Sequence, residues 1–401
     1  MRQECKQTGY MIYRELNNKD NLSVLGFGCM RFPKKGNGFD TDEIEREIRY
    51  AIESGVNYYD TAYLYPGNEE VFGKVLEKIG ARDKIRIATK MPNYFLKSPE
   101  EADRRFREQL LRLRTDHVDY YLMHMLPDVK TWEELCNRGI DRWLEEKKSE
   151  GLIKRIGFSY HGSSEMFIKI LHAYDWEFAQ IQYNYLDENS QAGVRGLKEA
   201  ASMHIPVIIM EPLRGGRLVN AIPEKARELI RTKTPGWSPA EFGLRWLWNQ
   251  PEVTTVLSGM NSMDMVKENI RIASETKEGS LTGEDMRTYA EVIDAIESKI
   301  KVRCTGCGYC MPCPAGVDIP GCFSTYNTSY NEGYTNGIRE YFMCTAMKNE
   351  RSMASQCRKC GKCEAHCPQG IKIREELARV RRRFENPIFK LATILAPRLR
   401  K

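Results

Sequence analysis

Residues 85–124 read IRIATKMPNYFLKSPEEADRRFREQLLRLRTDHVDYYLMH. The first six and the last seven residues are apolar runs of strand length, and Pro99 to Leu113 between them has helical spacing. Ser98, directly before Pro99, is a typical helix start. The stretch therefore predicts a strand, a helix and a second strand parallel to the first.

The same alternation recurs on both sides of this unit. The expected strands are 24–30, 56–60, 85–90, 118–124, 155–159, 178–183, 206–210 and 253–259. The expected helices are 42–54 (capped by Thr41), 69–79, 99–113, 132–150, 164–173, 194–203, 239–249 and 263–274. Eight repeats predict a closed (β/α)8 TIM barrel. The alternative, an open doubly wound sheet, calls for G-x-G-x-x-G after its first strand, and GFGCMRFP does not supply it.

The chain of 401 residues is long enough for one barrel of about 250 residues and one smaller domain. Its composition, 41% hydrophobic and 29% charged, is that of a globular protein. No stretch approaches the ~20 apolar residues that cross a bilayer, and residues 1–21 lack the apolar segment of a signal peptide. We therefore expect a cytoplasmic protein.

The net charge of +6 is concentrated near one end of the sequence. Residues 371–401 hold ten basic and three acidic residues, so they carry +7 and the rest of the chain carries −1. A neutral body argues against a nucleic-acid-binding protein. The tail, with RVRRRF and FKLATILAPRLRK, suits either an amphipathic segment on a membrane or partner, or a helix packed by its apolar side on its own domain. We favour the packed helix and expect no membrane-surface binding.

Ten of the thirteen cysteines follow residue 303, which points to metal ligands and not to disulfides. They include two runs, C-x2-C-x2-C-x2-C before Pro314 and C-x2-C-x2-C-x3-C before Pro368. In two-cluster ferredoxins three closely spaced thiolates hold one cubane cluster, and the Cys before Pro ligates the other. The runs therefore predict two [4Fe-4S] clusters, one held by Cys304, Cys307, Cys310 and Cys367, the other by Cys357, Cys360, Cys363 and Cys313.

Zinc is the alternative, although zinc sites seldom use three equally spaced Cys followed by Cys-Pro. In the first run two residues, and not the usual three, precede Cys313. This departure concerns Cys313, the predicted fourth ligand of the second cluster. The region resembles bacterial ferredoxins with two [4Fe-4S] clusters, and its longer gap, 314–356, is expected to contain helices. Cys322 and Cys344 in this gap lack cluster spacing and are expected to be packing residues.

The expected domain organisation follows from these patterns. It is a barrel over 1–282, a connecting helix over 283–302, a small, mainly helical ferredoxin-like iron–sulfur domain over 303–372, and a basic tail over 373–401. The small domain is too short for a large core of its own, so we expect metal to stabilise it.

Barrel enzymes place their chemistry at the C-terminal ends of the strands. The polar residues there are Asp60, with Tyr65 in the loop after it, Lys90, His124, Ser159 and Gln180. A neighbouring ammonium lowers the pKa of a phenol from its usual value near 10, and a carboxylate keeps that ammonium charged. Asp60, Lys90 and Tyr65 suit such a relay, in which Tyr65 protonates a carbonyl oxygen that His124 orients.

Eight stretches, in order, then point to one family. They are LGFGCMRFP, GVNYYDTAYLYPGNEE, IATKMP, HVDYYLMH, GLIKRIGFSYHG, QIQYNYL, VIIMEPLRGGRL and GWSPAEFGLRWLWNQPEVTTVLSGMNSMDMVKENI. With them, residues 10–275 resemble the aldo-keto reductase family. The resemblance implies a nicotinamide-dependent carbonyl reductase with the catalytic tetrad Asp60, Tyr65, Lys90 and His124.

The same resemblance implies a cofactor site along the barrel mouth. Its expected residues are Met30, then Ser159 and Gln180 (on the carboxamide), Met210, Glu211 and Leu213 (beside the nicotinamide), and Gly259, Glu268 and Asn269 (at the adenosine). Gly259, Met260 and Met265 stand where relatives that favour NADPH usually carry basic side chains for the 2′-phosphate. The choice between NADH and NADPH stays open, with NADH slightly favoured.

We expect an NAD(P)-dependent oxidoreductase for an aldehyde, ketone or sugar-like carbonyl substrate. The clusters would serve an electron-transfer protein partner or support the structure, because hydride moves two electrons together, a cluster accepts one, and no flavin motif is present. The alternative is a redox-sensing or regulatory module that binds nicotinamide and a partner with little turnover. The complete tetrad favours the enzyme.

Overall fold

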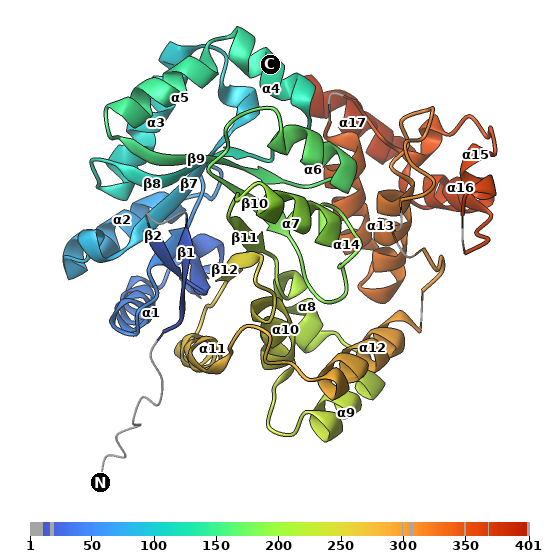
Figure 1. The fold of residues 1–401 in the computed structure, drawn as a ribbon. Helices are drawn as coiled ribbons and strands as arrows, with labels where there is room; N and C mark the ends of the chain where they lie inside the picture. The colour runs from blue at the N-terminus through green and yellow to red at the C-terminus, as the bar shows by residue number, and fades with distance from the viewer. Residues whose placement is uncertain are drawn as a thin grey trace.

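The computed structural model describes residues 11–16, 20–298, 300–304, 306, 308–348, 350–367 and 369–398. Eight parallel strands close into a barrel, as the sequence predicted (Figure 1). In barrel order from the first, they are β3 (Leu25–Gly28), β6 (Tyr58–Asp60), β7 (Arg86–Pro92), β8 (Val118–His124), β9 (Ile153–Tyr160), β10 (Phe178–Gln182), β11 (Val207–Met210) and β12 (Val253–Ser258).

Aromatic and branched side chains fill the inside of the barrel. Tyr120 packs edge-to-face on Tyr58 and Phe178, with ring centres 5.1 and 4.9 Å apart. A larger core lies between the strands and the surrounding helices. Because both faces of the strands are covered, β7 and β8 are buried along almost their whole length.

The helices around the barrel are α1 (Thr41–Glu53), α2 (Asn68–Ile79), α3 (Pro99–Leu113), α4 (Val129–Asn137), α5 (Ile140–Ser149), α6 (Ser164–Leu171), α7 (Gly193–Ser202), α8 (Arg217–Asn220), α9 (Glu224–Lys233), α10 (Pro239–Trp248) and α11 (Met263–Glu275). Ser98 caps α3 as predicted, but α1 is capped by Asp40, so the prediction of Thr41 was wrong. The helix predicted over 132–150 is two helices, because Gly139 adopts a left-handed conformation (φ 83°) between them. Helices α8 and α9 were not predicted.

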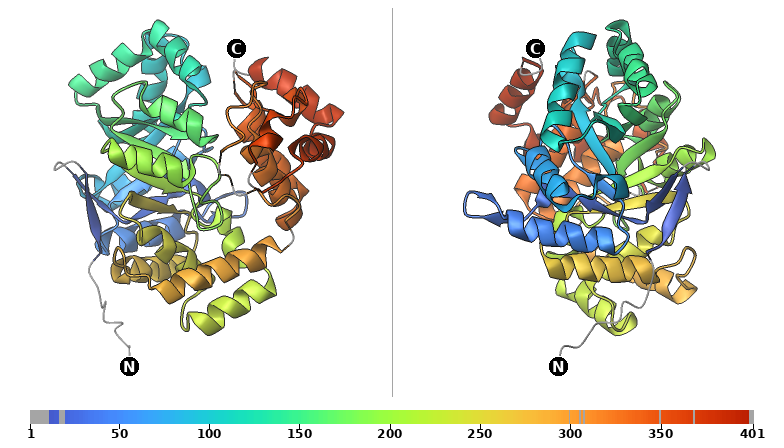
Figure 2. Two further views of the ribbon diagram at one scale, coloured as in Figure 1. Left: turned by 45° about the vertical axis from the view of Figure 1, so that its right-hand side comes forward. Right: turned by 90° about the vertical axis from the view of Figure 1, so that its left-hand side faces the viewer.

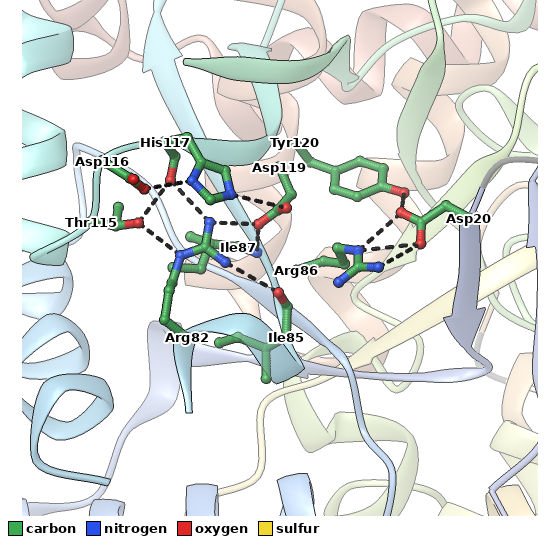
Figure 3. A network of polar contacts seen from close by, with 10 residues as sticks. All are labelled: Asp20, Arg82, Ile85, Arg86, Ile87, Thr115, Asp116, His117, Asp119 and Tyr120. Carbon is green, nitrogen blue, oxygen red and sulfur yellow. Dashed lines mark hydrogen bonds and ion pairs between the residues drawn. The ribbon is translucent and has the colours of Figure 1, made fainter. Parts of the chain in front are cut away.

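A hairpin of β1 (Tyr13–Leu16) and β2 (Asp20–Ser23), which the sequence analysis also missed, lies at the N-terminal end of the barrel. Its Asp20 accepts hydrogen bonds from Arg86 (Nη2–Oδ1 3.0 Å) and from the Tyr120 hydroxyl (3.1 Å), as Figure 3 shows. Beside this group, Arg82 pairs with Asp119 at 2.9 Å. These contacts tie neighbouring strands together at the end of the barrel that stabilises the fold.

The C-terminal third is helical and has a separate core (Figure 2). After α12 (Gly283–Glu297), which packs on the barrel and ends earlier than predicted, it contains α13 (Ile319–Asn331), α14 (Tyr334–Tyr341), α15 (Lys362–Ala365), α16 (Ile373–Phe384) and α17 (Pro387–Arg398). The predicted helices of the 314–356 gap are therefore present. Cys322 and Cys344 are buried, as expected of packing residues. The domain limits remain our proposal, which the two separate cores support.

In the basic tail, α16 packs as we favoured, with Ile373, Leu377, Val380 and Phe384 buried, but α17 does so only in part. On α17, Phe389 and Thr393 are buried, but Ile388, Leu391, Ile394 and Leu395 are 79%, 56%, 53% and 42% exposed. None of the helices in the described part of the chain has both the length and the apolar character that a membrane span requires.

Candidate active site

Three neighbouring strands bring the predicted tetrad together at the C-terminal mouth of the barrel. Asp60 ends β6, Lys90 lies in β7 and His124 ends β8. Tyr65 follows Asp60 in the loop before α2. Asn68 fixes this loop, because its side chain accepts from Thr61 Oγ1 (2.6 Å) and donates to the Cys29 carbonyl (2.7 Å).

The centre of the group is a buried ion pair. Lys90 Nζ donates to Asp60 Oδ1 at 2.5 Å and to the Thr61 carbonyl at 2.8 Å. The same ammonium lies 5.4 Å from the centre of the Tyr65 ring, and the His124 ring stands perpendicular to Tyr65 at 6.3 Å. The structure therefore places a cation, a phenol and an imidazole around one point, as the relay requires.

The pKa of Tyr65 is shifted in the direction opposite to the sequence-based expectation. Burial raises the pKa of Tyr65, and the Lys90 ammonium opposes this only in part, so the pKa lies above its ordinary value and not below it. For Lys90 burial lowers the pKa, but Asp60, Tyr65 and Cys29 together outweigh burial and the pKa is raised. At neutral pH Lys90 is charged and Tyr65 keeps its proton, which suits a proton donor.

His124 is neutral at physiological pH. Burial, with Lys90 and His161 nearby, lowers the pKa of His124 to about 3. Within the described residues its Nδ1 is buried and has no hydrogen-bond partner. A neutral imidazole with an unused nitrogen can hydrogen-bond a substrate oxygen without adding charge.

This neutral histidine predicts a loss of stability in acid. Between the folded pKa of about 3 and the ordinary value near 6.5, only the unfolded chain binds the proton, so stability falls as pH decreases through this window. The expected contribution is up to ~1.4 kcal/mol per pH unit. Urea unfolding of the parent and of His124→Gln at a series of pH values measures it. A parent that loses no more stability in acid than the variant would contradict the assignment.

The residues expected at the cofactor lie on the next strands around the mouth. Ser159 Oγ accepts from the Met125 amide at 2.8 Å. Gln180 Nε2 lies 3.6 Å from Met210 Sδ, and its buried Oε1 has no partner in the described part of the chain. Glu211 has a left-handed backbone (φ 52°), and Leu213 lies in the turn after it. An unpaired amide oxygen here is suited to a ligand donor such as a carboxamide N–H.

The residues expected at the adenosine follow β12. Asn269 Nδ2 donates to Ser258 Oγ at 2.8 Å, and Glu268 accepts from Ser238 Oγ at 2.6 Å. Both side chains therefore stabilise the segment that begins at Gly259. Met30 does not continue β3 as predicted, because the strand ends at Gly28, and its side chain is 62% exposed.

Arg31 is a residue that the sequence analysis missed. Its side chain crosses from Gly259 to Gly215: a Cβ on Gly259 would lie 2.7 Å from Arg31 Cδ, and one on Gly215 2.5 Å from Arg31 Nη2. A cation thus stands between the loops after β11 and β12. The only signal was its place directly after the first strand, in MRFP.

The described cysteines of the two predicted ligand sets lie in the C-terminal helical region. Cys304, Cys310 and Cys367 line one space of about 320 Å³, and Cys307 lies outside the described residues. Burial raises the pKa of the Cys363 thiol, with smaller contributions from nearby Glu364, Cys313 and Cys357. Cys360 is exposed. In the described ranges no three His, Cys, Asp or Glu side chains converge as on a single ion, and the exchange of fourth ligands stays a prediction.

Two family models match this chain, one over the barrel and one over the cysteine-rich region. The family model described as Aldo/keto reductase family matches residues 24–294, over half of the chain. The chain belongs to the aldo/keto reductase family. A second model, 4Fe-4S dicluster domain, matches residues 303–371 of this aldo/keto reductase.

Individual relatives match the aldo/keto reductase barrel over most of their own length. Aldo-keto reductase Rv2971 of Mycobacterium tuberculosis is 28% identical over 294 residues (69% of this chain, 94% of that protein). L-galactose dehydrogenase of Arabidopsis thaliana is 25% identical over 300 residues (70% and 92%). The holo form of aldo-keto reductase AKR11C1 from Bacillus halodurans is similar in structure, with 27% identity, a TM-score of 0.59 and coverage of 71% and 96%.

The dicluster domain covers one side of the mouth of the aldo/keto reductase barrel. A space of about 850 Å³, open to solvent, lies between them. The barrel lines it with His161, Gln182 and Glu211, and the dicluster domain with residues that include Ser324 and Met343. Gln182 Oε1 is buried without a partner in the described residues. Of these residues only Glu211 was predicted, as a neighbour of the nicotinamide, because the space exists only where two domains meet.

Buried ion pairs hold the two domains together. Arg214 pairs with Asp187 of the barrel (Nε–Oδ2 2.7 Å) and with Glu332 of the dicluster domain. Arg217 pairs with Glu332 and with Glu340 (2.9 Å). Removing one partner of such a group leaves a buried charge uncompensated, so the network fixes the dicluster domain against the mouth.

Proposed function

We propose that this aldo/keto reductase transfers hydride between NAD(P)H and a carbonyl or alcohol substrate held at the barrel mouth. The observation that carries the proposal is the Lys90–Asp60 pair beside Tyr65 and His124. Bound NAD(P)H supplies the hydride. The residues that would hold it are those around the barrel mouth, from Gln180 and Ser159 to Arg31 and Gly259.

The side chains provide the remaining chemistry. Tyr65 donates its phenolic proton to the carbonyl oxygen, and the Lys90 ammonium stabilises the phenolate that remains. Asp60 keeps Lys90 charged and in position at 2.5 Å. Neutral His124 hydrogen-bonds the carbonyl oxygen and orients it toward Tyr65. In the alcohol-to-carbonyl direction the same groups act in reverse.

The space beside the dicluster domain supports a substrate that carries hydroxyl groups. Gln182 supplies an unpaired acceptor, and His161 and Ser324 offer further hydrogen-bonding atoms. A site built to pair with a hydroxyl rejects an analogue that lacks it, because its own polar atoms are then left unpaired. We therefore expect hydroxylated aldehydes or ketones to be reduced with higher kcat/KM than alkyl analogues of equal length.

The proposal also assigns two [4Fe-4S] clusters to the dicluster domain. The first is held by Cys304, Cys307, Cys310 and Cys367, the second by Cys357, Cys360, Cys363 and Cys313. Their thiolates fit this use, since three members of the first set line one space and three members of the second lie close together.

Anaerobic turnover of the holoprotein tests the proposed function. Oxidation of NADH and NADPH is followed with a panel of hydroxylated and alkyl aldehydes and ketones, and the binding of each cofactor is measured by fluorescence. Turnover with any carbonyl supports the enzyme. Tight cofactor binding without turnover across the panel would favour a regulatory module instead.

Arg31 gives a prediction about the cofactor. Because its cation stands between the loops after β11 and β12, Arg31→Leu is expected to raise the Kd of NADPH about tenfold. An equal rise for NADH places the guanidinium on the shared diphosphate, and a rise for NADPH alone places it on the 2′-phosphate. Fluorescence titration of the parent and of Arg31→Leu with NADPH and with NADH measures these Kd values. Unchanged Kd values would exclude Arg31 from the cofactor site. Arg46→Leu, on an exposed part of α1, is the matched control.

A further inference from the structure

We propose that α17 is an anionic-membrane anchor, which places this oxidoreductase on a lipid surface with its dicluster domain nearest the bilayer. Figure 2 shows this last helix at the edge of the molecule. The inference does not depend on the proposed function, because it uses no residue of the tetrad or of the expected cofactor site.

One edge of α17 is docked on its own domain. The Phe389 ring packs against Tyr341 and Phe342, with ring centres 5.5 and 5.7 Å apart. Arg351 donates to the Thr393 carbonyl at 2.6 Å. These contacts hold the helix in a fixed orientation and leave its other side outward.

The outward side is apolar. At about 100° per residue, Ile388, Leu391, Ile394 and Leu395 fall with Ala392 within one arc of about 160°. Their exposed fractions lie between 42% and 79% for the four large side chains. Phe389 and Thr393 occupy the opposite, buried arc. A helix that presents a continuous apolar face to water is suited to lie in the plane of a membrane interface.

One cation borders this face, and two more are exposed on the preceding helix. Lys390 is exposed on α17 beside Ile394 in the helical projection, and Arg381 and Arg382 are exposed in the last turn of α16. In the described part of the chain these three cations form no ion pair with a carboxylate. Arg379 and Arg383, in contrast, contact Glu376 and Tyr330. Unpaired cations around an apolar face complement anionic headgroups.

A protein partner fits the face less well. A stable protein interface uses about 20–30 residues from each side, and the apolar arc of one three-turn helix offers far fewer. A lipid surface needs no matching shape, because acyl chains adapt to the side chains that enter them. The nearby positive charge and the small size of the apolar face therefore favour a lipid surface over a protein partner.

Vesicle sedimentation of the full-length holoprotein tests the proposal. Phosphatidylcholine vesicles with and without phosphatidylglycerol are the probes. We expect the parent to sediment with the anionic vesicles and to be released by added salt. The triple variants Ile388→Ser/Leu391→Ser/Leu395→Ser and Arg381→Glu/Arg382→Glu/Lys390→Glu are each expected to lower the partition coefficient at least about tenfold.

The controls distinguish binding through α17 from non-specific adsorption by other exposed apolar residues. Leu111→Ser/Met286→Ser replaces exposed apolar residues elsewhere, on α3 and α12, and should sediment like the parent. The proposal is overturned if the parent stays in the supernatant with both vesicle types, or if binding survives both triple variants. A concentration-dependent dimer that the serine variant abolishes would also overturn it, because a second copy would then cover the face.

Discussion

Tyr65→Phe is expected to lower kcat for carbonyl reduction by about 10²–10⁴-fold and to leave the Kd of NAD(P)H unchanged. The phenol is the proton donor, and its hydroxyl is lost while the ring that packs near Lys90 and His124 is kept. Anaerobic steady-state kinetics and cofactor titration of the same preparation measure both quantities.

Tyr63 provides the matched control for this variant. It lies two residues earlier in the same loop, but its hydroxyl contacts Glu108 at 3.0 Å and Arg105 at 2.9 Å, outside the tetrad. Tyr63→Phe should therefore keep the parent kcat. Equal rates for the parent and Tyr65→Phe, or an equal loss in both variants, would disprove the role of Tyr65.

Loss of single cluster ligands is the second large effect. Cys310→Ser and Cys363→Ser are each expected to lose about half of the bound iron and acid-labile sulfide, and the double variant nearly all of it. The separate core of residues 302–389 is small, and the cysteines pack around it, so metal loss should expose its amides to hydrogen exchange. The barrel amides should stay protected, because their core is separate.

Cys344→Ala is the control, since Cys344 is buried but lacks cluster spacing, and it should keep its iron. Full iron in Cys310→Ser and Cys363→Ser, or zinc in the parent, would contradict the two ligand sets. The double variant also tests whether the clusters take part in carbonyl reduction. Hydride transfer that persists at the parent rate without iron would show that the clusters act outside carbonyl reduction.

Much of this molecule could be predicted because its signals are local. Apolar runs that alternate with helical spacing predicted the eight strands of the barrel within a few residues of their observed ends. The same order of strands places Asp60, Lys90 and His124 at one mouth, since parallel strands share their C-terminal edge. Cysteine spacing likewise predicted which thiols would gather, and Cys304, Cys310 and Cys367 do line one space.

Other features depend on contacts that no local pattern encodes. Arg31 reaches Gly215 and Gly259 across more than 180 residues of sequence, and Arg214 reaches Glu332 across more than 100. The sign of the Tyr65 pKa shift was mispredicted for the same reason, because burial depends on everything that surrounds the ring. The exposed side of α17 was missed because sequence gives the apolar arc of a helix but not what covers it.

Sequence alone thus determined the repeating unit, the candidate residues for the chemistry and the thiols suited to iron, since each depends on residue type and spacing along one segment. The tertiary structure decided the electrostatics of the tetrad, the cation between two distant loops, the space between the domains and the uncovered helix face. These depend on packing between segments far apart in the chain, where burial and charge are set by neighbours that spacing does not reveal.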